Sequence, residues 1–172
     1  MIIAVSGLTG SGKNTLGESL AKALGYRLVC PTFKDLAAKE GIPLMEFQKK
    51  AEKDPKIDKK FDALLKEEAA KGDCVVTTWL GAWMVDADVR IRVFAPLKVR
   101  GERIAKRDKM SLKEAMEHVA KRDEQNRKRY LKLYKIDIFS EDIFDLSLNA
   151  GLHDPETMKR MALAVISEKQ EK

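Results

Sequence analysis

The sequence is poor in the residues that cross-link a protein, anchor it in a membrane or bind metals. Its 172 residues include only two cysteines, Cys30 and Cys74, which are too few for a disulfide framework. No run approaches the roughly 20 apolar residues that span a bilayer, and no leader peptide is recognisable. The two histidines, His118 and His153, have no partners at metal-ligand spacing. These absences argue against secreted mini-proteins, membrane-spanning proteins and side-chain metal centres, and we expect a protein of the reducing cytoplasm.

Aromatic residues are also scarce, at 6% of the chain, whereas charged residues make up 35% and leave a net charge of +6. The positive charge is concentrated, because residues 98–135 hold 14 Lys and Arg against 6 Asp and Glu. This segment has no aromatic residue before Tyr130 to stack on bases, so binding to nucleic acid is not favoured. A local cationic segment instead suits a lid that closes over several phosphates.

A glycine-rich motif lies near the start of the chain. Residues 7–15 (GLTGSGKNT) follow an apolar run at residues 2–5 and precede a helical pattern. Such glycines let the backbone curl so that N–H groups point at phosphate oxygens, and the lysine reaches the outer phosphates. Asn14 stands where a hydroxyl usually meets magnesium, and the hydroxyl follows at Thr15. We therefore assign the binding of nucleotide phosphates to Gly7, Leu8, Thr9, Gly10, Ser11, Gly12, Lys13, Asn14 and Thr15.

The apolar pattern after this loop alternates between strands and helices. Alternation predicts an α/β fold, a three-layer doubly wound parallel sheet that binds ligands at the carboxyl ends of its strands. Ser111 and Glu114 predict a capping box between two helices of a hairpin. The expected strands are residues 2–6, 27–30, 74–78, 90–95 and 144–149. The expected helices are residues 13–24, three short helices within 32–71, residues 99–109 and 112–134, and a last helix that opens at residues 154–155.

A cluster of basic residues lies in the second helix of the expected hairpin. Arg122, Asn126 and Arg129 are spaced i, i+4 and i+7, so they share one helical face and can converge on one ligand. Arginine suits a phosphate because its planar fork pairs bidentately and stays charged when water is excluded. Arg103 and Arg107 repeat the i, i+4 spacing on the preceding helix. The alternative for each arginine is a surface salt bridge with a neighbouring carboxylate.

In this order, the motifs make the chain resemble the archaeal-type cytidylate kinases, within the P-loop nucleoside monophosphate kinase family. The resemblance covers nearly the whole length, and its individual motifs are weak alone but specific together. Besides the phosphate loop, it is carried by residues 33–37 (FKDLA), 54–58 (DPKID), 80–84 (LGAWM), 103–107 (RIAKR), 129–130 (RY) and 134–138 (YKIDI).

The resemblance implies ATP-dependent phosphorylation of a pyrimidine nucleoside monophosphate, CMP or dCMP, with magnesium. We expect one P-loop kinase domain over residues 1–172, with an acceptor-binding helical region at residues 32–71. The hairpin with its lid would span residues 98–135. The family's R-D-x-x-D-x-x-R pattern, which grips the acceptor nucleotide, matches Arg122, Asp123, Asn126 and Arg129.

The chain departs from the family pattern at three places. Asn126 replaces an aspartate, and Lys34 replaces an arginine that contacts the acceptor phosphate, which keeps the charge but loses the fork. Thr77, Thr78 and Trp79 stand where the family ends its third strand with an acidic residue, a glycine and an arginine. The acid orients water around magnesium and the arginine helps to hold the acceptor, so this change bears on acceptor choice or rate. Threonine hydroxyls can still bind a metal-bound water.

These inferences divide the roles in phosphoryl transfer. Lys13 and the loop amides hold the donor phosphates, while Lys34, Arg122 and Arg129 place the acceptor. Arg103 and Arg107 close over the transferring group, and no general base is required. Two alternatives stay open: a P-loop kinase for another small acceptor, and a nucleotide-dependent ATPase associated with RNA or ribosomes. We expect nucleotides as partners and no membrane association, and the sequence indicates no oligomeric state. The residues assigned to catalysis are Lys13, Arg103, Arg107 and Arg122, and those assigned to the acceptor are Lys34, Arg122, Asn126 and Arg129.

Overall fold

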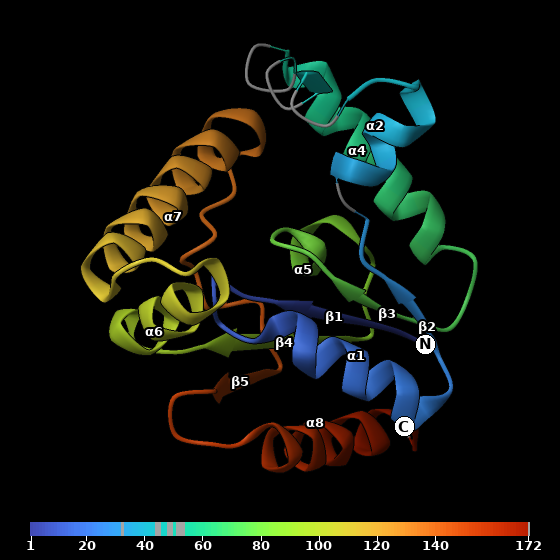
Figure 1. The fold of residues 1–172 in the computed structure, drawn as a ribbon. Helices are drawn as coiled ribbons and strands as arrows, with labels where there is room; N and C mark the ends of the chain where they lie inside the picture. Colours follow the sequence, from blue (N-terminus) through green and yellow to red (C-terminus); the bar gives the residue numbers. More distant parts are fainter. Residues whose placement is uncertain (32, 44–45, 48–49, 51–53, 172) are drawn as a thin grey trace.

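A computed structural model describes the chain except residues 32, 44–45, 48–49, 51–53 and 172 (Figure 1). Five strands form one parallel sheet in the order β2-β3-β1-β4-β5, so the carboxyl ends of all five meet at one edge. The strands are β1 (Ile2–Ser6), β2 (Arg27–Val29), β3 (Cys74–Thr77), β4 (Val89–Phe94) and β5 (Leu146–Asn149). The helices are α1 (Lys13–Leu24), α2 (Phe33–Glu40), α4 (Pro55–Ala69), α5 (Gly81–Met84), α6 (Leu97–Asp108), α7 (Leu112–Tyr134) and α8 (Pro155–Gln170).

Helices cover both faces of the sheet. α1 and α8 pack on one face, where Ile3 and Val5 of β1 belong to the larger core (Figure 1). α4 and α5 cover the other face, in a second core that contains Ala4 of β1 and Val76 of β3. Alternate residues of β1 therefore enter different cores, as expected for a parallel strand buried on both faces. These three layers confirm the predicted doubly wound fold.

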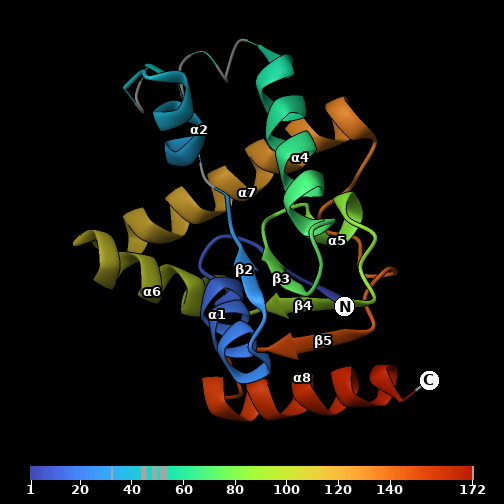
Figure 2. The ribbon, with the colours of Figure 1, turned by 90° about the vertical axis from the view of Figure 1, so that its right-hand side faces the viewer.

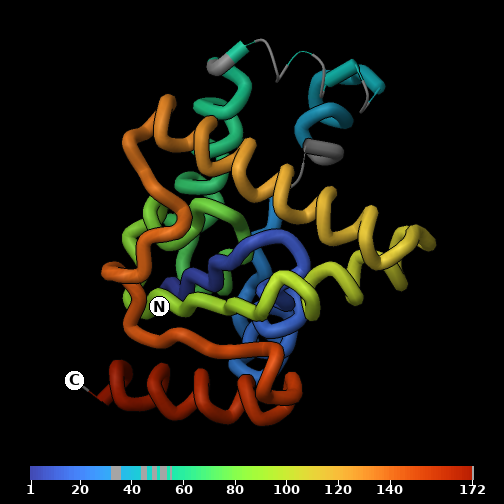
Figure 3. Tube along the Cα trace, turned by 90° about the vertical axis from the view of Figure 1, so that its left-hand side faces the viewer, coloured from blue at the N-terminus to red at the C-terminus, as the bar shows by residue number. Residues whose placement is uncertain are grey.

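The helices α6 and α7 form the predicted hairpin at one side of the sheet. The expected capping box is present at the start of α7, because the Ser111 hydroxyl accepts from the Glu114 backbone N–H while the Glu114 carboxylate accepts in return. The two helices cross closely at Gly101, where an added Cβ would lie 2.5 Å from Cγ of Met116. The far end of α7 then lies beside α4 (Figures 2 and 3). The hairpin thus connects the phosphate loop to α4.

The predicted element bounds agree with the structure to within two residues in the strands and long helices. Within residues 32–71 the structure describes α2 and α4, and the third expected helix falls where residues 44–45, 48–49 and 51–53 lie outside the described residues. The short helix α5 was not predicted, because four residues are too few to show a helical period. None of the described helices is long and apolar enough to cross a membrane.

Candidate active site

The phosphate loop between β1 and α1 has the backbone conformation that its glycines predict. Gly10 and Gly12 have φ angles of 73° and 100°, in the left-handed region that favours glycine. A Cβ on Gly7 would lie 2.3 Å from the carbonyl oxygen of Val93, so that position also needs glycine. α1 begins at Lys13, and its N-terminal end therefore faces the loop. The loop combines left-handed glycines with a helix N-terminus, which is the arrangement that binds phosphate.

Lys13 is the half-buried first residue of α1. No described Asp or Glu lies within ion-pair distance of its Nζ, which instead lies 5.5 Å from the ring centroid of Trp79. Desolvation and then the positive charge of Arg122 lower the pKa of Lys13 from 10.5 to about 8, although Cys30 and Asp123 act in the opposite direction. Arg107 acts in the same direction as Arg122. Lys13 and these two arginines therefore form one cationic region.

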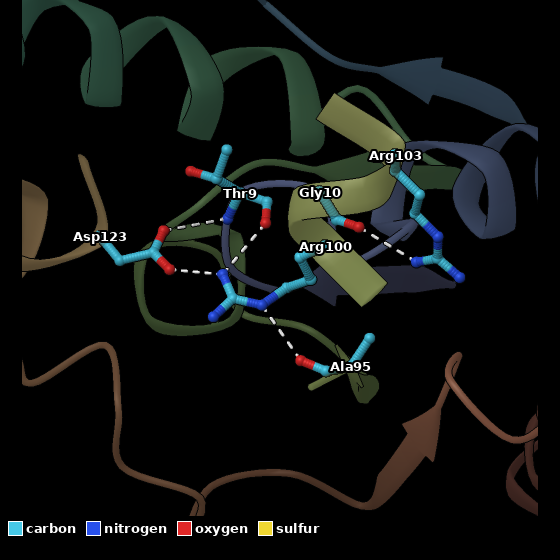
Figure 4. A network of polar contacts seen from close by, with 6 residues as sticks. All are labelled: Thr9, Gly10, Ala95, Arg100, Arg103 and Asp123. Carbon is cyan, nitrogen blue, oxygen red and sulfur yellow. Dashed lines mark hydrogen bonds and ion pairs between the residues drawn. The ribbon is translucent and has the colours of Figure 1, made fainter. Parts of the chain in front are cut away.

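A buried network fixes the loop to the hairpin (Figure 4). The Asp123 carboxylate on α7 accepts a hydrogen bond from the Thr9 backbone N–H, 3.2 Å away, and forms an ion pair with Arg100 on α6. Arg100 also donates to the carbonyl oxygens of Thr9, at 3.1 Å, and Ala95, at 3.0 Å. Asp123 and Arg100 are 3% and 8% exposed. Asp123, assigned by its motif to the acceptor, instead holds the donor loop here.

Arg103 and Arg107 occupy different surroundings. The Arg103 guanidinium donates to the carbonyl oxygen of Gly10 at 3.0 Å (Figure 4). It also donates to the carbonyl oxygens of Ser11, at 2.9 Å, and of Ala150 after β5, at 2.6 Å. Arg103 therefore connects the phosphate loop to the end of β5, whereas we expected it to close over the transferring group. Arg107 pairs with its neighbour Asp108 at the exposed end of α6.

The predicted basic face of α7 contains three residues in three situations. Arg122 is exposed, and none of the described residues forms a hydrogen bond or ion pair with it. Asn126, one turn further on, is half-buried. Arg129 donates from Nε and Nη2 to the carboxylate of Asp58 on α4, at 2.6 to 3.0 Å. Of the two arginines on this face, Arg122 has no partner among the described residues, and its charge acts on Lys13.

Two carboxylates on α4, which the sequence reasoning did not single out, complete the contact with α7. Asp58 binds Arg129, and Asp62 accepts a hydrogen bond from the Tyr134 hydroxyl. Burial raises the pKa of both carboxyls, against the opposing effect of their hydrogen-bond donors. Asp58 ends the motif at residues 54–58 that carries part of the resemblance, and the other signal was the i, i+4 spacing of Asp58 and Asp62 on one helix. Lys34 lies in the neighbouring α2, and its side chain falls outside the description.

Four buried hydroxyl oxygens near the loop have no hydrogen-bond partner among the described residues. They belong to Thr9 and Ser11 in the loop and to Thr77 and Thr78 at the end of β3. Buried hydroxyls are normally satisfied, so this cluster indicates that phosphate oxygens or water complete it. In the described part of the chain, no group of three or more His, Cys, Asp or Glu could hold a metal ion. A hydrated magnesium still fits, because it binds oxygen, keeps several waters and takes its other ligands from substrate phosphates.

A family model and several curated proteins are similar to this chain over most of its length. Residues 2–151 match the model of the cytidylate kinase-like family. The cytidylate kinase of Ignicoccus hospitalis is 42% identical, covering 94% of this chain and 99% of its own. The cytidylate kinase of Pyrobaculum neutrophilum is 45% identical, covering 96% of this chain and 92% of its own. That of Pyrococcus abyssi is 42% identical, covering 100% and 97%.

Solved structures share the fold at low sequence identity. An uncharacterised protein from Eubacterium ventriosum is similar with a TM-score of 0.70 and 17% identity, over 97% of this chain and 98% of its own. Shikimate kinase from Acinetobacter baumannii gives a TM-score of 0.62 at 16% identity, over 99% and 95%. A gluconokinase from Sinorhizobium meliloti gives a TM-score of 0.57 at 19% identity, over 96% of this chain and 91% of its own.

Proposed function

The chain belongs to the cytidylate kinase-like family, and we propose that it transfers the γ-phosphoryl group of ATP to CMP or dCMP, which yields ADP and the nucleoside diphosphate. The observation that carries the proposal is the intact loop between β1 and α1, with a half-buried Lys13 at its exit. The choice of CMP is supported by the names of relatives that are more than 40% identical over nearly the whole chain.

On the donor side, the loop amides and Lys13 bind the β- and γ-phosphates. Phosphoryl transfer needs alignment and charge neutralisation more than covalent chemistry, so a fixed loop is the main requirement. Three positioning residues, Arg100, Arg103 and Asp123, fix the loop without touching the substrate. They hold the carbonyl and N–H groups of residues 9–11. Arg107 remains our candidate for closing over the phosphates, because its only polar partner in the described residues is the adjacent, exposed Asp108.

The residues near the loop are compatible with magnesium. The Thr15 hydroxyl is exposed at the first turn of α1, and the unpaired hydroxyls of Thr77 and Thr78 can hold waters of a hydrated ion. When bound, magnesium neutralises charge on the β- and γ-phosphates. The chain itself contributes hydroxyls here where the family has a carboxylate.

On the acceptor side, Arg122 binds the phosphate of CMP, and Lys34 of α2 stays our second candidate for this phosphate. Arg129 is held by Asp58, which keeps one edge of its guanidinium fixed and connects the acceptor helices to the hairpin. Asn126 lies between the two arginines on the same face and offers an amide to the nucleotide. Water exclusion by the hairpin would then strengthen each of these charged contacts.

Replacing Arg122 by methionine is expected to raise the KM for CMP roughly 10- to 100-fold and to leave the KM for ATP within about threefold, because one charge-assisted contact is lost. Arg127→Met is the matched control on the same helix. Arg127 pairs with Asp137 and lies 4.6 Å from the ring centroid of Phe139, so its loss should not change the KM for CMP. Equal effects of the two variants on this constant in a coupled assay would remove Arg122 from the acceptor site.

The affinity for ATP is expected to fall as the pH rises above 8, because the pKa of Lys13 is lowered to about 8 and the neutral amine attracts phosphate less. The charged form is the binding form, so affinity is highest below this pKa. Lys13→Arg keeps its charge over the whole range, since arginine stays protonated up to about pH 12. Calorimetric titrations of ATP from about pH 7 to 9.5 should therefore show a slope in the native protein and none in the variant. The same slope in both would contradict a role for Lys13.

A coupled assay for ADP tests the function itself, with CMP, dCMP, UMP, dUMP, AMP, shikimate and gluconate as acceptors. ADP formation with CMP or dCMP well above the rate without acceptor is the expected result. A preference for a non-nucleotide acceptor would favour a different small-molecule kinase. ATP hydrolysis that is stimulated by RNA, and that does not change with any acceptor, would favour the ATPase alternative.

A location in the cytoplasm stays a prediction from the low cysteine content.

A further inference from the structure

Trp79 stands at the carboxyl end of β3, beside the phosphate loop. It directly follows Thr77 and Thr78, and its ring centroid lies 5.5 Å from Nζ of Lys13. The side chain is half-buried and also lines a small cavity next to Gly7 and Leu8. The indole therefore touches both the lysine and the loop from which that lysine extends.

Among the described residues, no carboxylate forms an ion pair with the ammonium of Lys13. Asp123 favours its charge from a distance, as does Cys30, but Asp123 is committed to Arg100 and to the Thr9 backbone N–H. Thr77 and Thr78 are neutral, and Arg122 and Arg107 repel the ammonium. A half-buried ammonium without an ion pair gains from another partner, and the negative face of an indole is the strongest that an aromatic side chain offers.

We propose that Trp79 is the positioning residue for Lys13, and that its indole face holds the ammonium in the orientation that binds the donor phosphates. Because the attraction to a ring is weaker than an ion pair, the lysine is oriented without being neutralised. The inference rests on the proposed function only in requiring that the loop binds ATP.

Fluorination of the indole tests this proposal without changing packing. Fluorine withdraws electron density from the ring face and so weakens its attraction for a cation, while the shape of the side chain is nearly kept. The chain has only two tryptophans, and Trp83→Phe leaves Trp79 as the sole site for incorporated 5-fluoro- or trifluorotryptophan. Trp79→Phe gives the reverse protein, labelled only at Trp83, whose ring packs edge-on against Phe144 at 5.4 Å.

The dissociation constant for ATP, measured by calorimetry without acceptor, is the readout. We expect it to rise stepwise with fluorination at Trp79, roughly 2- to 30-fold in total, and to stay constant with fluorination at Trp83. Thermal unfolding should be unchanged along each series. Flat affinity along the Trp79 series, with ATP still bound, would overturn the inference and leave the proposed function intact.

A second comparison covers the case in which Trp83→Phe does not fold. Trp79→Phe keeps a weaker ring face, and Trp79→Leu removes it, so the leucine variant should bind ATP the more weakly of the two. Equal affinities would again overturn the inference. Failure of the native protein to bind ATP would overturn the proposed function, whereas stepwise ATP affinity without phosphorylation of CMP would overturn only the acceptor.

Discussion

Replacing Lys13 by methionine is expected to lower kcat/KM for ATP by at least about 10³-fold, because the transferring phosphoryl group loses its nearest positive charge. Methionine has nearly the length of lysine and fills the same half-buried space, so the loop should keep its shape. The loss should exceed that for Arg122→Met, since in the proposed function Lys13 contacts the group that changes charge during the reaction, whereas Arg122 contacts a phosphate that is bound throughout.

The same variant should be as stable as the native protein or more stable. Burial and the charge of Arg122 lower the pKa of Lys13 to about 8, which means that the fold disfavours its charged form. At neutral pH the native fold therefore carries an unfavourable charge that methionine removes. Loss of activity together with an equal or higher thermal midpoint would identify Lys13 as a group kept for function at the expense of stability.

Lys22→Met is the control, because Lys22 lies on the exposed side of the same helix, α1. It should change neither kcat/KM nor the thermal midpoint appreciably. A coupled assay at saturating CMP gives the rate constants, and scanning calorimetry gives the midpoints. If Lys13→Met retains more than about a tenth of the native kcat/KM, its role on the donor phosphates is refuted.

Local sequence patterns predicted the elements and the loop, because each depends on residues close along the chain. The apolar run at residues 2–5, the glycines that follow it and the capping box of Ser111 and Glu114 all act within a few positions. Their physics is that of backbone conformation and helix ends, which a single sequence carries in full. The doubly wound parallel sheet followed from the same alternation, whereas the order of its strands was not predicted.

The partners of the arginines could not be predicted in this way. The spacing of Arg122 and Arg129 indicates a shared helical face, but not which element packs against it. Asp58, the partner of Arg129, lies 71 residues away along the chain, and only the contact of α4 with α7 brings the two together. Arg100 gave no signal except its i, i+3 spacing from Arg103, although it is the most buried arginine among the described residues.

Trp79 illustrates a different limit. Its position at the end of β3 could be read from the sequence, and both a stacking role and a core role were compatible with an aromatic residue there. The position of the Lys13 ammonium over the Trp79 ring distinguishes these two roles, and it depends on the turn between Gly12 and α1. Side-chain direction across two elements is a property of the packed fold.

Replacing Asp123 by alanine is expected to lower the free energy of unfolding by about 3 to 5 kcal/mol, because it leaves the guanidinium of Arg100 buried without its counter-charge. The Thr9 backbone N–H also loses its acceptor, and burial makes that loss costly. For a chain of this size, the thermal midpoint should fall by roughly 6 to 20 °C. Urea unfolding and calorimetry measure the two quantities, and Asp137→Ala, which breaks a more exposed pair with Arg127, should have a much smaller effect.

The double variant Arg100→Met with Asp123→Leu separates stability from function at this network. Apolar side chains of similar size remove both charges, so most of the lost stability should return. Activity should not return, because the Thr9 carbonyl and N–H would lose the two groups that fix them, and the loop would sample other conformations.

A double variant with native kcat/KM would mean that the network only stabilises the fold. A single variant within about 1 kcal/mol of the native protein would mean that Arg100 finds water or another acceptor when Asp123 is absent. The result expected here, restored stability with activity still reduced at least about tenfold, would show that the ion pair is retained because it orients the donor loop.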